Sequence, residues 1–235
     1  VQTNWAELWL LIISGIIGIA IADSLFFKSL NMIGAGLTAI VDCSYSPMTI
    51  LLSYLFLSER ISISMIGGSL LVALAVVIGA YQKGNRDLDL LNTVKGIILG
   101  LLAIFFILTS VILMKPVLET KSIFFVTEIR LVAGLIGIGL IISFRKNRKQ
   151  IFKSAFDRTN FKYAFPAAFL GNVLSMTFWI AAFKLTNINS AAILNQTNTI
   201  FIIIMASLFL KEIFTVRKLI ATMLAIGGSL IVILA

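Results

Sequence analysis

The chain has 235 residues, of which 60% are hydrophobic and only 12% are charged, and its mean hydropathy is +1.07. This composition excludes a water-soluble domain and predicts an integral membrane protein in a lipid bilayer. The formal net charge is +9, but the basic residues lie between the apolar stretches rather than along one face, which argues against nucleic-acid binding. The chain has no histidine and a single cysteine, which argues against metals, cofactors and disulfides.

Hydropathy predicts eight membrane-spanning helices, because each crossing needs about 20 apolar residues. In chain order they cover residues 8–30, 35–57, 63–81, 94–117, 123–144, 163–185, 190–210 and 217–235. The stretches 31–36, 82–93 and 186–190 separate some of these spans and are rich in Gly, Asn or charged residues, which end helices. The sequence therefore predicts an all-α polytopic membrane protein.

A short sequence occurs twice, and it indicates an internal duplication. Leu-Phe-Leu-Ser-Glu ends at Glu59 and Leu-Phe-Leu-Lys-Glu ends at Glu212, so the copies lie 153 residues apart (212 minus 59). At this interval the first three predicted spans fall on the last three. We therefore expect residues 1–81 to be the last three helices of one repeat, 82–93 a linker, and 94–235 a second repeat with five helices.

This arrangement predicts that two further helices precede Val1 in the complete protein, which would then contain ten. Because five is odd, consecutive five-helix repeats run in opposite directions across the bilayer, which makes an inverted repeat of the kind that secondary transporters use.

The repeated motif resembles the EamA family of the drug/metabolite transporter superfamily. That family ends a helix with Leu-x-Glu and opens the next with a glycine-bearing apolar stretch, and here Glu59 is followed by Gly67-Gly68 and Glu212 by Gly227-Gly228. A segment that reads Glu-Ile-Arg-Leu-Val-Ala, with Arg130 at its third position, is similar to the arginine that the family often carries in an apolar run. The resemblance implies a ten-helix carrier with a central cavity, and it leaves the substrate open.

Two polar runs lie at equivalent depth in the repeats. Asp42-Cys43-Ser44-Tyr45-Ser46 falls, at the same interval, on Asn195-Gln196-Thr197-Asn198-Thr199. Inverted repeats bring such positions together near the midplane, where substrate sites lie. The candidate binding residues are Asp42, Ser44, Tyr45, Asn195, Gln196 and Asn198. Alternatively, these side chains only hydrogen-bond neighbouring helices.

Ionisable side chains within predicted spans are further candidates, because charges in the bilayer are costly. Asp23 has no polar counterpart in the repeat, which suits an asymmetric ligand or a single proton, but it could also form a structural ion pair with Arg130. Glu128 and Arg130 are two positions apart and should point to different helix faces. Arg130 could bind a substrate carboxylate or phosphate, or serve in a structural pair.

The span 163–185 offers Asn172 and Trp179, and Trp179 could form an aromatic wall of the cavity or simply face lipid. Pro47, just after the first polar run, is expected to kink its helix and free a carbonyl there.

These patterns favour a secondary transporter, a permease or exporter in the plasma membrane, that moves a small metabolite or drug-like solute by alternating access. A proton is an optional coupling ion. A membrane receptor or non-transporting subunit remains an alternative. An enzyme is not expected, because the chain lacks histidine and any paired catalytic motif.

Overall fold

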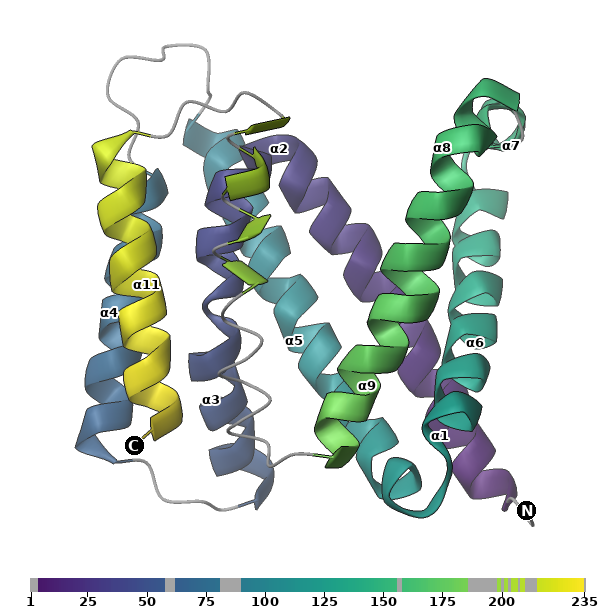
Figure 1. Ribbon diagram of the computed structural model, residues 1–235, viewed down its shortest axis with the longest axis horizontal. Helices are drawn as coiled ribbons and strands as arrows, with labels where there is room; N and C mark the ends of the chain where they lie inside the picture. Colours follow the sequence, from purple (N-terminus) through teal and green to yellow (C-terminus); the bar gives the residue numbers. More distant parts are fainter. Residues whose placement is uncertain are drawn as a thin grey trace. The chain divides into compact units, whose positions relative to one another are not determined.

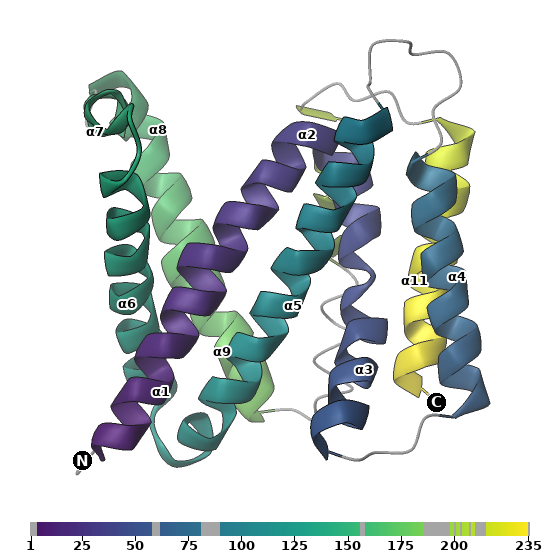
Figure 2. The ribbon, with the colours of Figure 1, turned by 180° about the vertical axis from the view of Figure 1, so that it is seen from behind.

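The computed structural model describes residues 4–57, 62–80, 90–155, 158–185, 198–199, 201–202, 204–206, 208–209 and 215–234. Every regular element in these ranges is a helix (Figures 1 and 2). Four helical stretches among them are long and apolar enough to cross a membrane: Trp5–Asp42, Leu90–Thr120, Ile123–Ser143 and Ala164–Leu185. The prediction of an all-helical membrane protein is thereby confirmed, whereas eight spans stay a prediction.

In chain order the described helices are α1 (Trp5–Gly15), the π-helix η1 (Ile16–Ile21), α2 (Ala22–Asp42), α3 (Tyr45–Leu57), α4 (Ile63–Ala80), α5 (Leu90–Thr120), α6 (Ile123–Ser143), α7 (Arg148–Ala155), α8 (Arg158–Ala168), the π-helix η2 (Phe169–Leu174), α9 (Ser175–Leu185) and α11 (Val216–Leu234). Most of the predicted span 190–210 lies outside the described residues.

The expected turn at residues 31–36 takes the form of a kink at one glycine. Gly34 lies inside α2 with φ 77° and ψ 166°, a backbone conformation that residues with a Cβ atom rarely adopt. One turn after the kink, the hydroxyl of Thr38 donates to the Gly34 carbonyl at 2.7 Å. The chain therefore passes from the first predicted span to the second with only this local break.

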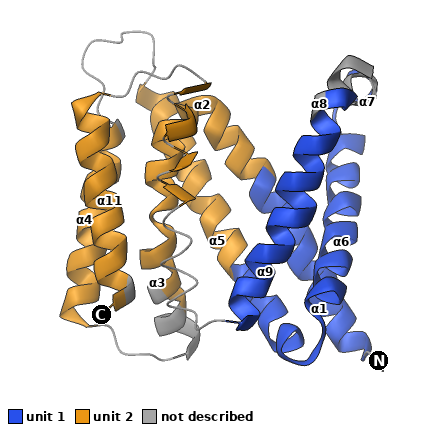
Figure 3. Ribbon diagram, in the orientation of Figure 1, with its two compact units in different colours: residues 1–23, 109–187 blue, residues 24–108, 188–235 orange. Residues whose placement is uncertain are grey.

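The chain divides into two compact units (Figure 3). Unit 1 comprises residues 1–23 and 109–187, and its apolar core includes Leu11, Met114 and Ile180. Unit 2 comprises residues 24–108 and 188–235, with one cluster that includes Leu37 and Ile104 and another that holds residues of α2, α4 and α11. Each unit thus has apolar packing of its own.

Helix boundaries recur at the interval of the duplicated motif. The two π-helices begin at Ile16 and Phe169, and α4 and α11 begin at Ile63 and Val216, so each pair is 153 residues apart (169 minus 16, 216 minus 63). Helices α1 and α8 match in the same way, since Trp5 and Arg158 begin them. A π-helix is a rare element, so two of equal length in this register are hard to attribute to chance.

Within unit 2, α4 and α11 pack side by side (Figures 1 and 2), and a glycine of each helix lies at their contact. A Cβ atom added to Gly68 would lie 2.6 Å from the carbonyl oxygen of Gly228, and one added to Gly228 would lie 2.7 Å from that of Gly68. Gly68 also faces Val232, whereas Gly79, further along α4, faces Ala221, which comes earlier in α11. The two helices therefore run antiparallel.

Candidate functional site

The first polar run lies at a break between two helices. Helix α2 ends at Asp42, residues 43 and 44 form a turn, and α3 begins at Tyr45. In the tight turn the amide of Ser44 donates to the carbonyl of Val41 at 2.9 Å. The predicted span 35–57 is therefore not one continuous helix: the polar run lies across two helix ends in its middle.

Pro47 explains why one backbone carbonyl at this break has no hydrogen-bond donor within its helix. Proline has no amide hydrogen, so the carbonyl four residues earlier, that of Cys43, has no helical donor. The hydroxyl of Ser229, on α11, donates to this oxygen at 3.0 Å, and Ser229 is fully buried. The freed carbonyl that the sequence predicted is thus present, and another helix satisfies it.

Replacing Ser229 with alanine is expected to destabilise the purified protein by about 1–3 kcal/mol, because the buried Cys43 carbonyl would lose its donor. The loss should appear as a lower midpoint of thermal unfolding in detergent. Ser143, an exposed serine whose hydroxyl bonds within its own helix, is the control: Ser143→Ala should leave the midpoint unchanged. Equal midpoints for both variants would contradict the proposed role of Ser229.

The two polar runs meet at one described contact. The sulfur of Cys43 lies 3.7 Å from the hydroxyl oxygen of Thr199, and both side chains are buried. Thr199 is the last residue of the second run, so residues of both polar runs touch beside the break. Asn195 and Gln196, two other candidates from that run, lie outside the described residues, and Asn198 is exposed.

Around this contact the other candidates of unit 2 differ in burial. Tyr45 is 6% exposed and packs in an apolar cluster with Leu37 and Leu108, whereas Asp42 and Ser44 are half-buried. Within the described part of the chain, no hydrogen bond or ion pair joins the Asp42 carboxylate to another group. Asp42 is therefore an acid at a helix break with no protein counter-ion among those residues.

In unit 1 the charged candidates lie on opposite faces of α6: Glu128 is exposed, and Arg130 is buried at 1% exposure. The guanidinium donates from Nη2 to the hydroxyl of Ser110 at 3.2 Å, and Nη1 contacts the sulfur of Met114. Asp23, half-buried at the start of α2, acts on Arg130 through its charge. No ion pair within 4.0 Å joins the two among the described residues, so the direct pair that the sequence left open is not formed.

The remaining candidates of unit 1 are less enclosed. Asn172 is exposed in η2. Trp179 is half-buried and packs against the apolar cluster of unit 1, with its ring edge-on to Phe183 at a centroid distance of 4.8 Å. These contacts account for Trp179 by packing within its own unit.

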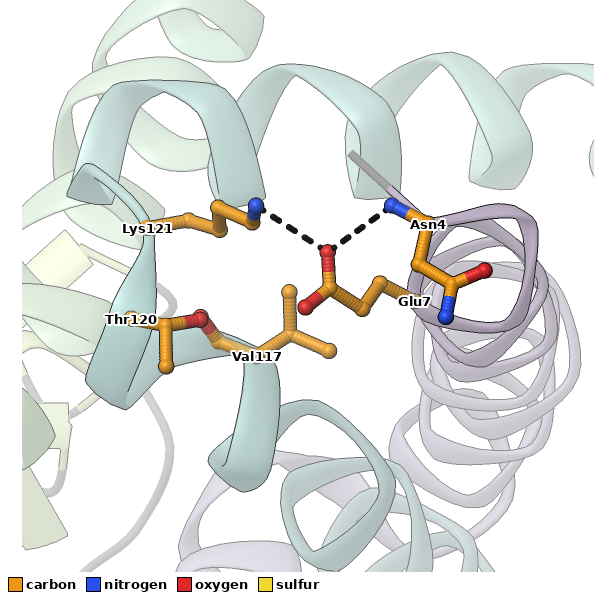
Figure 4. Close-up of polar contacts among 5 residues, drawn as sticks. All are labelled: Asn4, Glu7, Val117, Thr120 and Lys121. Atoms are coloured by element: carbon orange, nitrogen blue, oxygen red, sulfur yellow. Dashed lines mark hydrogen bonds and ion pairs between the residues drawn. The ribbon is translucent and has the colours of Figure 1, made fainter. Parts of the chain in front are cut away.

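Three partners were not predicted from the sequence: Ser110 and Met114 beside Arg130, and Ser229 beside Cys43. Also unexpected is an ion pair between Lys121 Nζ and Glu7 Oε2 at 3.1 Å (Figure 4). The same carboxylate oxygen accepts from the backbone amide of Asn4 at 3.2 Å, so it ties the start of α1 to the turn between α5 and α6. In the described ranges no three His, Cys, Asp or Glu side chains gather as a metal site.

The all-helical fold and the apolar spans, with a few charged and polar side chains buried among them, define an integral membrane protein. The sequence model of the EamA-like transporter family matches residues 1–80 and 94–234, nearly the whole chain. The chain therefore belongs to the EamA-like transporter family, within the drug/metabolite transporter superfamily. A search of the curated proteins found no match.

Proposed function

We propose that the protein is a secondary carrier of a small solute in the plasma membrane, and that it works by alternating access between two inverted repeats. Membership of a transporter family supports this class of function. The observation that carries the proposal is the helix break in unit 2, where Cys43 of one polar run contacts Thr199 of the other. Discontinuous helices that meet near the midplane are where secondary transporters bind their substrates.

The packing of α4 against α11 supports the inverted repeat. These helices begin at equivalent positions, and equivalent helices of inverted repeats must run antiparallel when they meet. Their contacts also exchange under the repeat interval: the Gly79–Ala221 contact becomes Gly68–Val232, since 79 and 232, like 68 and 221, differ by 153. Such reciprocity is what a two-fold axis between the helices produces.

In this mechanism Asp42 is the residue that a solute or proton meets at the break. It ends α2, where the helix dipole is negative, so its ionised form gains nothing from that helix. A proton or a cationic group on the solute would neutralise it, and release to one side of the membrane would return the charge. Rocking of the repeats about the α4–α11 contact would expose the break to each side in turn.

Uptake into proteoliposomes tests this proposal. The purified chain should be reconstituted and offered labelled amino acids, sugars, nucleotide-linked compounds and quaternary ammonium drugs. We expect saturable uptake of at least one class, above that of protein-free liposomes, and a loss of about tenfold or more in Asp42→Asn, the size of effect expected when a hydrogen bond to a charged group is lost. Glu119→Gln, which neutralises an exposed carboxylate on α5, is the matched control and should transport normally.

Two results would count against this function. If no class of solute were taken up by protein that remains folded and monodisperse, the carrier would be excluded in favour of a receptor or subunit. If uptake occurred but was equal in Asp42→Asn and wild type, the role of Asp42 would be wrong while the carrier would stand.

A further inference from the structure

Arg130 carries a buried positive charge that no described residue neutralises by direct contact. Its side chain is 1% exposed, and its Nε has no hydrogen-bond partner in the part of the chain that the structure describes. Of its two contacts, the Ser110 hydroxyl is uncharged, and the Met114 sulfur is a weak acceptor. A buried cation in this setting is costly unless an anion pairs with it.

The surroundings of Arg130 show that space is kept for the guanidinium. A Cβ atom added to Gly18 would lie 2.4 Å from Ser110 Oγ and 3.1 Å from Arg130 Nη2. A Cβ atom on Gly15 would lie 2.5 Å from the backbone oxygen of Arg130. Two glycines of α1 and η1 thus let these helices approach α6 closely, and three elements, η1, α5 and α6, hold the charged group in one place.

Asp23 is the acid that faces this group. It is the second residue of α2, separated from the end of η1 by Ala22, and its charge acts on Arg130 although the two are not within ion-pair distance. The carboxylate therefore compensates the guanidinium only in part. Two parallel N–H groups of a guanidinium can bind an oxyanion. In Arg130, Nε has no partner among the described residues and Nη1 contacts a thioether.

We infer that Arg130 binds an oxyanion, a carboxylate or phosphate group, of the transported solute, and that Asp23 competes with that group for the guanidinium. The oxyanion would displace Met114 from Nη1 and engage Nε, while Ser110 keeps its hydrogen bond. When the solute leaves, the charge of Asp23 again compensates the guanidinium in part. This inference rests on the proposed carrier function in taking the oxyanion to be part of the solute.

Because Asp23 competes with the oxyanion for Arg130, substitutions of these two residues should change oxyanion binding in opposite directions. Binding to the purified protein tests this expectation without a transport assay. The purified full chain in detergent is titrated with sodium phosphate and with sodium acetate, against sodium chloride at equal ionic strength, while the thermal midpoint is measured. We expect at least one oxyanion to raise the midpoint of the wild type. Arg130→Gln should abolish the rise, and Asp23→Asn should reach it at an oxyanion concentration lower by about threefold or more, since a competing charge partner is gone.

Two further variants keep the test decisive. Arg130→Lys retains the charge but loses the planar fork, so it should fold even if Arg130→Gln does not, and its apparent affinity should fall by about tenfold. Lys149→Gln removes an exposed charge on α7 and should bind the oxyanion as the wild type does. Phosphate alone stabilising the protein indicates a phosphorylated solute, and acetate alone a carboxylate.

A structural ion pair predicts something different. Asp23→Asn and Arg130→Gln would then both lower the midpoint without added oxyanion, and neither would change the response to it; that result overturns the inference. Uptake measurements distinguish failure of this inference from failure of the carrier proposal. Uptake of a solute without an acidic group, equal in wild type and Arg130→Gln, would overturn the anion site alone. Opposite effects of the two variants on binding, without uptake of any solute, would leave the anion site and remove the carrier.

Discussion

Gly68→Ala is expected to lower the thermal midpoint of the purified protein by several degrees. The new Cβ would lie 2.6 Å from the Gly228 carbonyl oxygen and 2.8 Å from a methyl carbon of Val232, both on α11. A backbone oxygen cannot rotate away, so α4 and α11 would have to separate. Overpacking of this kind costs about 1–3 kcal/mol, more than the gain of about 0.8–1.0 kcal/mol that alanine brings to a helix. Circular dichroism at the helical band measures the midpoint.

The neighbouring residue supplies the control for that experiment. An added Cβ at Gly67 meets nothing within 4 Å, so Gly67→Ala should keep or raise the midpoint through helix propensity alone. Gly228→Ala should repeat the loss seen with Gly68→Ala, because the contact is reciprocal. Equal midpoints for the variants at 67 and 68 would show that α4 and α11 do not approach as closely as described.

Gly18→Ala is expected to destabilise unit 1 by a similar amount, about 1–3 kcal/mol. Its Cβ would lie 2.4 Å from Ser110 Oγ and 2.8 Å from Ser110 Cβ, so rotating the hydroxyl would not relieve the clash. Tryptophan fluorescence is the appropriate measurement, because Trp5, Trp9 and Trp179 all lie in unit 1. Thermal unfolding followed in this way should shift to lower temperature.

Two further substitutions test whether the contact between residues 18 and 110 causes this loss of stability. Ser110→Gly removes both clashing atoms, so the double variant should be more stable than the sum of the single effects predicts. Gly171 occupies the equivalent position in η2, where an added Cβ meets nothing within 4 Å, and Gly171→Ala should be neutral. Additive effects in the double variant would rule out the contact between residues 18 and 110 as the source of the loss.

Much of the fold was predictable, because it depends on composition and on glycine and proline, whose backbone conformation or hydrogen bonding differs from that of other residues. The apolar runs predicted helices of membrane-spanning length, and the duplicated motif predicted the family, which the match over residues 1–80 and 94–234 confirms. The turn at 31–36 contains Gly34, the residue that takes a positive φ. Pro47 predicted a freed carbonyl, since the missing amide hydrogen is a property of the residue itself.

Other features depend on distant partners and were not predictable. Hydropathy averages over a window of about 19 residues, so a two-residue turn after Asp42 does not alter it. The π-helices differ from α-helices only in hydrogen-bond register, which apolar residues leave undetermined. Arg130 stood out as a charge in an apolar run, but Ser110 and Met114 lie 20 and 16 residues earlier on another helix, and no local pattern identifies them as its neighbours.

The recurrence of helix boundaries has a consequence for the proposed duplication. Because Trp5, Ile16 and Ile63 are matched at one constant interval by Arg158, Phe169 and Val216, no net insertion or deletion separates the copies over this length. Under the proposed duplication, the copies differ by their side chains at a constant spacing, and each of these positions has one counterpart. Segments can therefore be transplanted between the copies residue for residue, and such chimaeras would reveal which differences, such as Asp23 against Met176, make the two halves unequal.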